Sequence, residues 1–259
     1  MLCVVDVMGV TQLHDVVYIV CHASSAILRF NATTHQRLAD IDVKGLGVPA
    51  DIVACEQTSQ LYVADWLEHC VWRVSTDGAD IKLCWTKSPT DLFTPTSLSV
   101  TSTRLLVTSR NTNQLIQLDS LGNELRRVQL PDNIQPWHAV ESPTATFIVS
   151  HTSTQLMQCH ISEVNTDGQV LRHFTRSHLP PLGLTQHIAI DSHGNVFVAD
   201  RDNGHILLLD AQLKLRRVII DEHQLNYQRP RRLCYREPTA QLLVAFGDKT
   251  VAVFDVFRG

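Results

Sequence analysis

The chain has 259 residues, of which 44% are hydrophobic and 19% are charged, and its formal net charge is −4. This is the composition of an ordinary globular protein with enough apolar material for a sizeable core. The slight acidic excess argues against a protein held to nucleic acid mainly by phosphate contacts, and no apolar run is long enough to span a membrane.

The first predicted element is a strand near the N-terminus, over residues 2–5 (Leu-Cys-Val-Val). After it, a short run of β-branched, aromatic and aliphatic residues that ends at a strand corner occurs six times. The runs are VVYIVC ending at Cys21, QLYVAD at Asp65, RLLVTS at Ser109, TFIVSH at His151, NVFVAD at Asp200 and QLLVAF at Phe246. The corners are 44, 44, 42, 49 and 46 residues apart, and such a period with short strands is typical of a β-propeller.

Further predicted strands flank each run. A second strand follows every corner, and a turn rich in Gly and Asp leads from it to a third, more polar strand such as ELRRVQL. An inner strand, usually opened by proline, precedes the corner strand in five copies: PADIVA, PTSLSV, PWHAVE, TQHIAI and PRRLCY. The pattern predicts an all-β fold, a six-bladed β-propeller with four-stranded antiparallel blades, the proline-led strand at the axis and the polar strand outermost.

The last copy predicts how the ring closes. The chain ends at Gly259, just past the third strand of that copy, so the last blade lacks an outer strand. We expect the strand over residues 2–5 to pair with the strand from Thr250 to Phe254, because a closed ring leaves no exposed strand edge.

Two segments carry a resemblance to a known repeat. The segment from Ile188 to Leu209, IAIDSHGNVFVADRDNGHILLL, resembles the NHL repeat, and LYVADWLEHCVWRVSTDG from Leu61 is similar to it and to the YWTD repeat of lipoprotein-receptor propellers. NHL-like propellers serve as protein-recognition domains, as RNA-binding domains in tripartite-motif proteins and as the scaffold of the peptide-amidating lyase. The resemblance implies a single NHL-like domain over residues 1–259, standing in a longer chain as such propellers often do.

One position of the inner strands concentrates polar side chains. When these strands are aligned on their prolines, it holds Asp51, Ser97, His138, His187 and Arg232. The arrangement resembles that of the amidating lyase, which binds a metal through channel histidines. Asp51, His138 and His187 are therefore candidate ligands of a catalytic metal such as zinc. The alternative is that both histidines line the channel and bond to water and backbone.

The loops that follow the corners share one face of the ring, which we name the corner-loop face. With neighbouring loops, this face carries the predicted binding residues His22, Trp66, Arg110, Trp137, Arg201, Tyr227, Arg229 and Arg231. Aromatic residues and arginines dominate the binding energy of many protein interfaces. The alternative is that Trp66 and Trp137 are buried between blades.

We expect a protein- or peptide-recognition platform without catalytic activity and without a cofactor. An RNA-binding NHL domain is the first alternative, because Tyr227 stands beside Arg229, Arg231 and Arg232 and could stack on a base. The second alternative is a metal-dependent lyase or hydrolase with its site in the channel. The scattered cysteines contain no CxxC pair and no signal sequence precedes them, which favours a cytoplasmic location, and we expect a monomeric domain.

Overall fold

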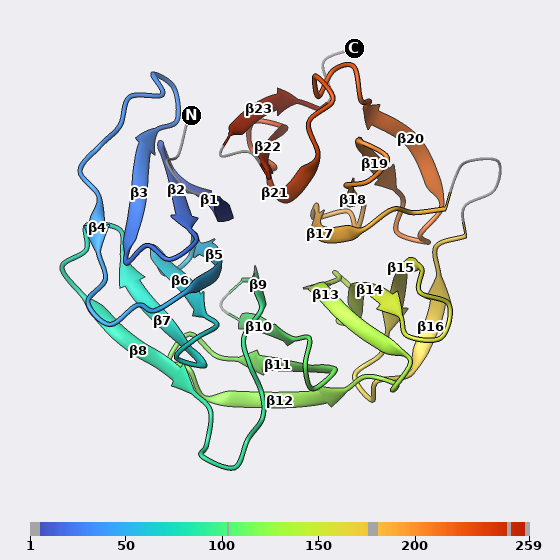
Figure 1. The fold of residues 1–259 in the computed structure, drawn as a ribbon, viewed down its shortest axis with the longest axis horizontal. Coiled ribbons are helices and arrows are strands. Elements are labelled where there is room, and N and C mark those ends of the chain that lie inside the picture. The colour runs from blue at the N-terminus through green and yellow to red at the C-terminus, as the bar shows by residue number, and fades with distance from the viewer. Residues whose placement is uncertain (1–5, 103, 176–180, 248–249, 257–259) are drawn as a thin grey trace.

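The computed structural model describes residues 6–102, 104–175, 181–247 and 250–256. Within these ranges the chain forms strands that pair into six antiparallel sheets, arranged as blades around a central axis (Figure 1). The predicted all-β, six-bladed propeller is confirmed. The described residues form no helix, and so none that is long and apolar enough to cross a membrane.

The first three blades follow one another along the chain, each as a meander. The first contains β1 (Val7–Leu13), β2 (Val16–Cys21), β3 (Ala26–Asn31) and β4 (Ile41–Asp42). The second contains β5 (Pro49–Cys55), β6 (Gln60–Asp65), β7 (Cys70–Ser75) and β8 (Ile81–Thr86). The third contains β9 (Ser97–Thr101), β10 (Arg104–Ser109), β11 (Gln114–Leu118) and β12 (Glu124–Gln129).

The last three blades repeat this order. The fourth contains β13 (Ile134–Glu141), β14 (Phe147–Ser153), β15 (Cys159–Val164) and β16 (Val170–His173). The fifth contains β17 (Thr185–Ile190), β18 (Val196–Asp200), β19 (His205–Leu209) and β20 (Leu215–Ile220). The sixth has three described strands, β21 (Pro230–Arg236), β22 (Gln241–Phe246) and β23 (Val251–Asp255).

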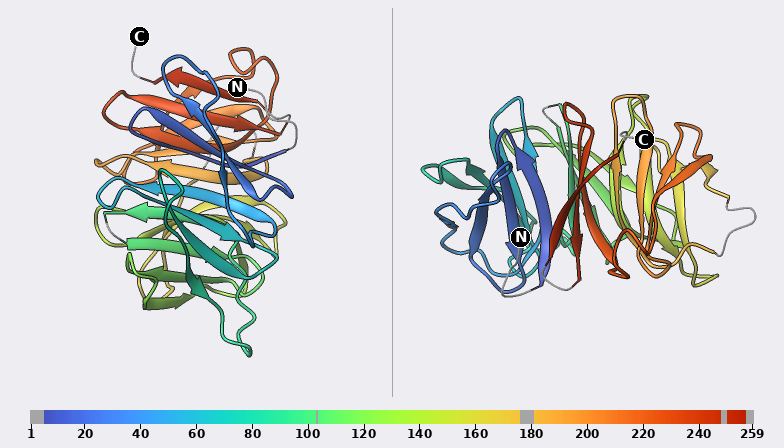
Figure 2. Two further views of the ribbon diagram at one scale, coloured as in Figure 1. Left: turned by 90° about the vertical axis from the view of Figure 1, so that its left-hand side faces the viewer. Right: turned by 90° about the horizontal axis from the view of Figure 1, so that it is seen from above.

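The first strand of each blade lies at the axis (Figure 1), as predicted for the inner strands of the second to sixth blades. Seen edge-on, the ring is a disc whose strands run between its two faces (Figure 2). Neighbouring strands are antiparallel, so the loop after each corner and the loop that leads into the next blade emerge at the same face. This places the corner loops together on the corner-loop face.

Apolar side chains fill the spaces between neighbouring blades. Each corner strand is buried on both faces, as in β6 and β10, which explains why these strands read as continuous apolar runs. The first and last blades share one such cluster, in which Val10 and Ile19 pack with Leu243 and Val251. Packing between these blades therefore closes the ring within the described residues.

The predicted pairing of the N-terminal strand with the last blade is not described, because residues 2–5 lie outside the described ranges. The strand expected over Thr250–Phe254 is β23, Val251–Asp255. The inner strand of the first blade, β1, had no counterpart in the prediction, since it contains no proline to mark its start.

The recurring corner aspartates stabilise the loops. The Asp65 carboxylate accepts hydrogen bonds from the backbone N–H groups of Gly47 at 2.7 Å and Val48 at 3.1 Å, and Asp200 accepts one from Gly183 at 2.9 Å. Each acid thus ties its corner to the loop that enters the same blade.

The fourth blade departs from the prediction, because β14 continues two residues past the predicted corner at His151.

Candidate functional site

A β-bulge recurs at one place in the inner strands. The pairing register shifts there in β1, β5, β13, β17 and β21, but not in β9. A bulge re-aims the side chain beside it, and here it turns residues toward the axis. The aligned position holds Gly9, Asp51, Ser97, His138, His187 and Arg232.

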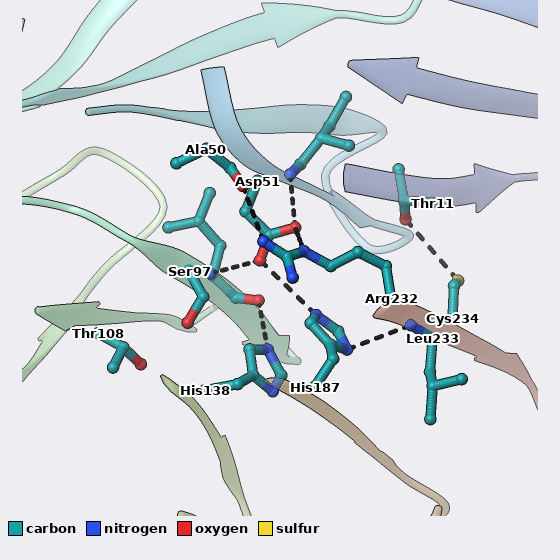
Figure 3. Close-up of polar contacts among 12 residues, drawn as sticks. Thr11, Ala50, Asp51, Ser97, Thr108, His138, His187, Arg232, Leu233 and Cys234 are labelled. Atoms are coloured by element: carbon teal, nitrogen blue, oxygen red, sulfur yellow. Dashed lines mark hydrogen bonds and ion pairs between the residues drawn. The ribbon is translucent and has the colours of Figure 1, made fainter. Parts of the chain in front are cut away.

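The structure brings together the residues that alignment on prolines selected. Figure 3 shows Asp51, His138, His187 and Arg232 pointing toward one another from four blades. We name these four residues the axial cluster. The sequence analysis missed Gly9, the sixth member of the position, for the same reason that it missed β1.

Asp51 is the centre of the axial cluster. One of its carboxylate oxygens, Oδ2, accepts the Leu98 N–H at 2.9 Å and lies 3.7 Å from Nε2 of His187. The other, Oδ1, accepts the N–H of Ile52 at 3.0 Å and lies 3.9 Å from Nε of Arg232. Burial raises the pKa of Asp51, and the charge of Arg232 opposes that rise.

The two histidines stack with their ring centroids 3.7 Å apart. Nδ1 of His138 accepts the Ile188 N–H at 3.4 Å, and Nδ1 of His187 accepts the Leu233 N–H at 3.3 Å. Each neutral ring therefore carries its proton on Nε2, and His138 donates this proton to the Leu98 carbonyl oxygen at 3.0 Å.

Electrostatics keep both rings neutral. Burial lowers the pKa of His138 well below its usual value, and the neighbouring His187 lowers it further. Burial also lowers the pKa of His187 well below its usual value, with a second contribution from the charge of Arg232. The axial cluster is thus a carboxylate facing one guanidinium and two neutral imidazoles.

Side chains at the aligned position bond to backbone groups of another blade's inner strand. The contacts are Asp51 with Leu98 N, Ser97 with Trp137 O, His138 with Ile188 N, His187 with Leu233 N and Arg232 with Ala50 O. Arg232 passes over the first blade, where Gly9 has no side chain, and joins the sixth blade to the second. These contacts link five blades around the axis.

Asp51, His138 and His187 have potential ligand atoms within 4.8 Å of one another. Their donor set does not fit a metal ion in this arrangement. Both ring nitrogens of His138 are bonded to backbone groups, and the guanidinium of Arg232 lies against the carboxylate, where its charge opposes a second cation. One imidazole nitrogen and one carboxylate remain, whereas catalytic zinc takes three protein ligands. The cluster is built as an ion pair within a ring of hydrogen bonds.

A pocket of about 560 Å³, which we name the corner-loop pocket, opens on the corner-loop face beside Arg232. Five of the predicted binding residues line it: His22, Trp66, Arg110, Trp137 and Arg231. Trp66 is 51% exposed and Trp137 is half-buried, so neither is a fully buried residue between blades.

Three predicted binding residues, Arg201, Tyr227 and Arg229, do not line this pocket. Tyr227 is exposed and its hydroxyl bonds to Nδ1 of His223 at 2.9 Å. Arg229 forms an ion pair with Asp202 at 3.8 Å. These residues belong to the corner-loop face but stand away from its pocket.

Arg110 and Trp137 form the wall of the corner-loop pocket. The guanidinium of Arg110 stacks 3.6 Å from the centroid of the Trp137 ring, and its Nη2 donates to Oε1 of Gln135 at 3.0 Å. Nε1 of Trp137 donates to Oγ1 of Thr152 at 2.8 Å. The wall is therefore fixed in position before any ligand binds.

A second pocket, of about 540 Å³, lies among the opposite ends of the inner strands and is lined by His138, His187, Arg236 and Glu237 among others. Arg232 lines the corner-loop pocket instead. The axial cluster therefore stands between the two pockets and separates one end of the channel from the other.

A polar cluster in the fourth blade escaped the sequence analysis. Oγ of Ser162 lies 2.7 Å from Nε2 of His151 and 2.8 Å from Nδ1 of His173, and burial lowers the pKa of His151 to about 4. The ring of His151 also stacks on the ring of His160, and both histidines line a pocket of about 520 Å³. Only the pairing register of β14, β15 and β16 reveals this group, because the sequence spacing of its members has no recognisable period.

Comparison with known proteins informs the fold alone. No family model and no curated protein matches the chain. Among solved structures, a Staphylococcus aureus virginiamycin B lyase variant with quinupristin has a TM-score of 0.70 at 14% identity, over 95% of this chain and 79% of that one. Kuenenia stuttgartiensis hydrazine synthase has a TM-score of 0.68 at 13% identity, over 96% and 83%. A streptogramin B lyase has a TM-score of 0.67 at 10% identity, over 98% and 95%.

These likenesses correct one expectation and leave another untested. The prediction that the chain has no enzymatic activity is corrected, because the similar propellers include lyases and a hydrazine synthase and the shared fold therefore does not argue against catalysis. The propeller resemblance is confirmed, but no family model supports the NHL repeat itself, which stays a prediction.

Proposed function

We propose that the chain recognises a protein or peptide partner through its corner-loop face. The observation that carries this proposal is the corner-loop pocket with Trp66, Trp137 and arginines in its lining. Beside it stand two exposed leucines, Leu67 on the loop of Trp66 at 52% exposure, and Leu92 at 74%. The carbonyl oxygen of Leu92 accepts a hydrogen bond from the pocket residue Asn111, so the backbone of Leu92 lies next to the pocket lining. Large apolar side chains exposed beside a pocket are typical of interaction surfaces.

The charges on this face favour a protein over RNA. Asp202 pairs with Arg229, one of the residues on which the RNA alternative depends, and Glu68 is exposed on the loop of Trp66. An RNA strand that crossed the face would bring its phosphates close to these carboxylates, whereas RNA binding depends on a continuous positive surface.

A selection from random libraries tests this proposal. The purified chain is immobilised and exposed in parallel to a phage-displayed library of random peptides and to a random RNA pool at physiological salt. We expect peptides to be enriched on the wild-type chain, and Trp66→Ala to abolish their binding. Enrichment of RNA sequences with tight, selective binding, or of no ligand at all, would overturn the proposal.

The axial cluster supports a second candidate, catalysis in the channel. Nε2 of His187 faces a carboxylate oxygen of Asp51, and His187 also lines the pocket at the opposite end from the corner loops. A histidine beside an acid is a common proton-transfer pair, and Nε2 is the ring nitrogen available for it here because Nδ1 accepts the Leu233 N–H. Quinupristin, the compound named with one similar structure, is a suitable first probe. Conversion seen by liquid chromatography and lost in His187→Gln would support this candidate, and an unchanged compound would remove quinupristin as its substrate.

A further inference from the structure

The charges that line the corner-loop pocket are all of one sign. Arg110, Arg231 and Arg232 line it, and no aspartate or glutamate is among its described lining residues. The chain as a whole carries a net charge of −4, so the excess of arginines is a local feature. A cavity whose charged lining residues are all cationic concentrates positive potential at its mouth.

The three arginines differ in how their charges are balanced. Arg232 faces Asp51, and its Nη1 and Nη2 donate to the carbonyl oxygens of Arg231 and Ala50. Arg110, in contrast, donates to the neutral amide of Gln135, and its buried Nε has no hydrogen-bond partner among the described residues. Among the described residues, the guanidinium of Arg110 therefore contacts no carboxylate.

Arg231 lines the same pocket. Burial lowers its pKa, and the charge of the neighbouring Arg201 lowers it further, while Asp6 acts in the opposite direction. Burial is also the main cause that lowers the pKa of Arg110. Two partly desolvated guanidiniums in one pocket gain most from a ligand that brings a negative charge.

The rest of the lining combines apolar and aromatic side chains with neutral polar ones, among them Thr94, Thr96 and Asn111. Val48, Pro49 and Ala50 line the pocket together with Trp66 and Trp137. A ligand that fits both features has one anionic group with a large apolar group beside it. A peptide with an acidic side chain next to an aromatic or aliphatic residue has this chemistry, whereas a polyphosphate strand would leave the apolar part of the lining without a partner.

We propose that the corner-loop pocket binds an aspartate or glutamate side chain of a partner peptide, held by Arg110 and Arg231, with an adjacent apolar residue against Trp66. This inference rests on the proposed function and specifies its ligand. The guanidinium fork of arginine suits a carboxylate because it can donate two parallel hydrogen bonds. Stacking on Trp137 holds the fork of Arg110 in one orientation for this contact.

The test uses the tightest peptide from the random-peptide selection and measures its Kd by isothermal titration calorimetry. We expect the selected peptides to share an acidic residue next to a large apolar one. Replacing that carboxylate by its carboxamide should weaken binding about 10- to 100-fold, the range for losing a charged hydrogen-bond partner. Arg110→Gln should weaken the acidic peptide equally, and should have little further effect on the carboxamide peptide, because the two changes remove one interaction.

Matched variants separate the possible failures. Arg126→Gln changes an exposed arginine on the outer strand β12 and should leave the Kd unchanged. Arg231→Gln serves as a second pocket variant, with an expected loss in the same range, should Arg110→Gln disturb the wall it forms with Trp137. Peptides that bind through Trp66 but carry no acidic residue, or that bind equally well as carboxamides, would overturn this inference and leave the proposed function standing. Peptide binding that survives Trp66→Ala would overturn both.

Discussion

Gly9 and Asp51 occupy equivalent positions on neighbouring inner strands, and Asp51 fills the space that a side chain at Gly9 would need. A β-carbon added at Gly9 would come within 2.6 Å of the Ile52 backbone nitrogen and 2.9 Å of Oδ1 of Asp51. The first blade thus has no side chain at this position, and Asp51 of the second blade occupies the space at the axis.

Gly9→Ala should therefore destabilise the fold by about 2 kcal/mol, the usual scale for overpacking a dense interior. Because the nearest atom belongs to the backbone, Asp51→Ala should not rescue it. Ser97→Ala, at the equivalent position of β9, is the matched control and should cost about 1 kcal/mol, the contribution of one hydrogen bond. Urea unfolding measures both, and a Gly9→Ala chain as stable as wild type would contradict the packing described for the axis.

The ion pair of Asp51 and Arg232 predicts non-additive effects. Asp51→Asn leaves the guanidinium of Arg232 without its facing charge, and should lower the free energy of unfolding by about 3 kcal/mol. Arg232→Met in the same chain removes that unpaired cation, so the double variant should be more stable than the sum of the single changes by about 1 kcal/mol or more. Strict additivity in urea unfolding would show that the two groups do not interact.

Burial of His151 predicts a loss of stability in acid. Its pKa is about 4 in the folded chain and about 6.5 when unfolded, so below pH 6.5 the unfolded state binds more protons. Stability is fully present above pH 6.5 and falls as the pH drops toward 4, by up to about 1.4 kcal/mol per pH unit for this one residue. His151→Gln should reduce the slope of unfolding free energy against pH between 6.5 and 4.5 by that amount. An unchanged slope would mean that His151 is protonated as readily in the folded chain as in the unfolded one.

The tautomers of the axial histidines are open to a direct check. At pH 7 the nitrogen-15 NMR spectrum should show His138 and His187 neutral, each with its proton on Nε2, because both Nδ1 atoms accept backbone hydrogen bonds. Equimolar zinc should leave these signals in place, since the Nε2 proton of His138 is donated to Leu98. Loss of the Nε2 protons with tight zinc binding would contradict the donor-set argument and favour a metal site.

Much of the fold could be predicted because the corner strands repeat. Asp65 and Asp200 end strands at the expected residues, since burial on both faces requires a continuous apolar run and the corner requires an acceptor for backbone N–H groups. β1 and the two-residue β4 could not be predicted, because neither has the proline or the length that marks its counterparts.

The site was only partly predictable, for a geometric reason. Prolines fix the alignment of four inner strands, and the fifth, TQHIAI, fits the same pattern with Thr185 in place of the proline, so the gathering of Asp51, His138 and His187 followed from sequence. The β-bulges decide which imidazole nitrogens bond to backbone groups. Each bulge shifts the pairing register, and no sequence pattern marks where this shift occurs. The stacking of Arg110 on Trp137 could likewise not be predicted, because the two residues belong to different blades and no local sequence pattern specifies how these blades are placed relative to each other.

The most direct test of the central claim, that the corner-loop pocket is the binding site, uses the indole N–H signals of the chain's four tryptophans in proton NMR. Trp66 and Trp137 line the pocket, whereas Trp85 packs against Phe93 outside it and serves as an internal control. On titration with the selected acidic peptide, the signals of Trp66 and Trp137 should shift and saturate together, and that of Trp85 should stay in place. Saturating peptide that leaves Trp66 and Trp137 unmoved would contradict the account.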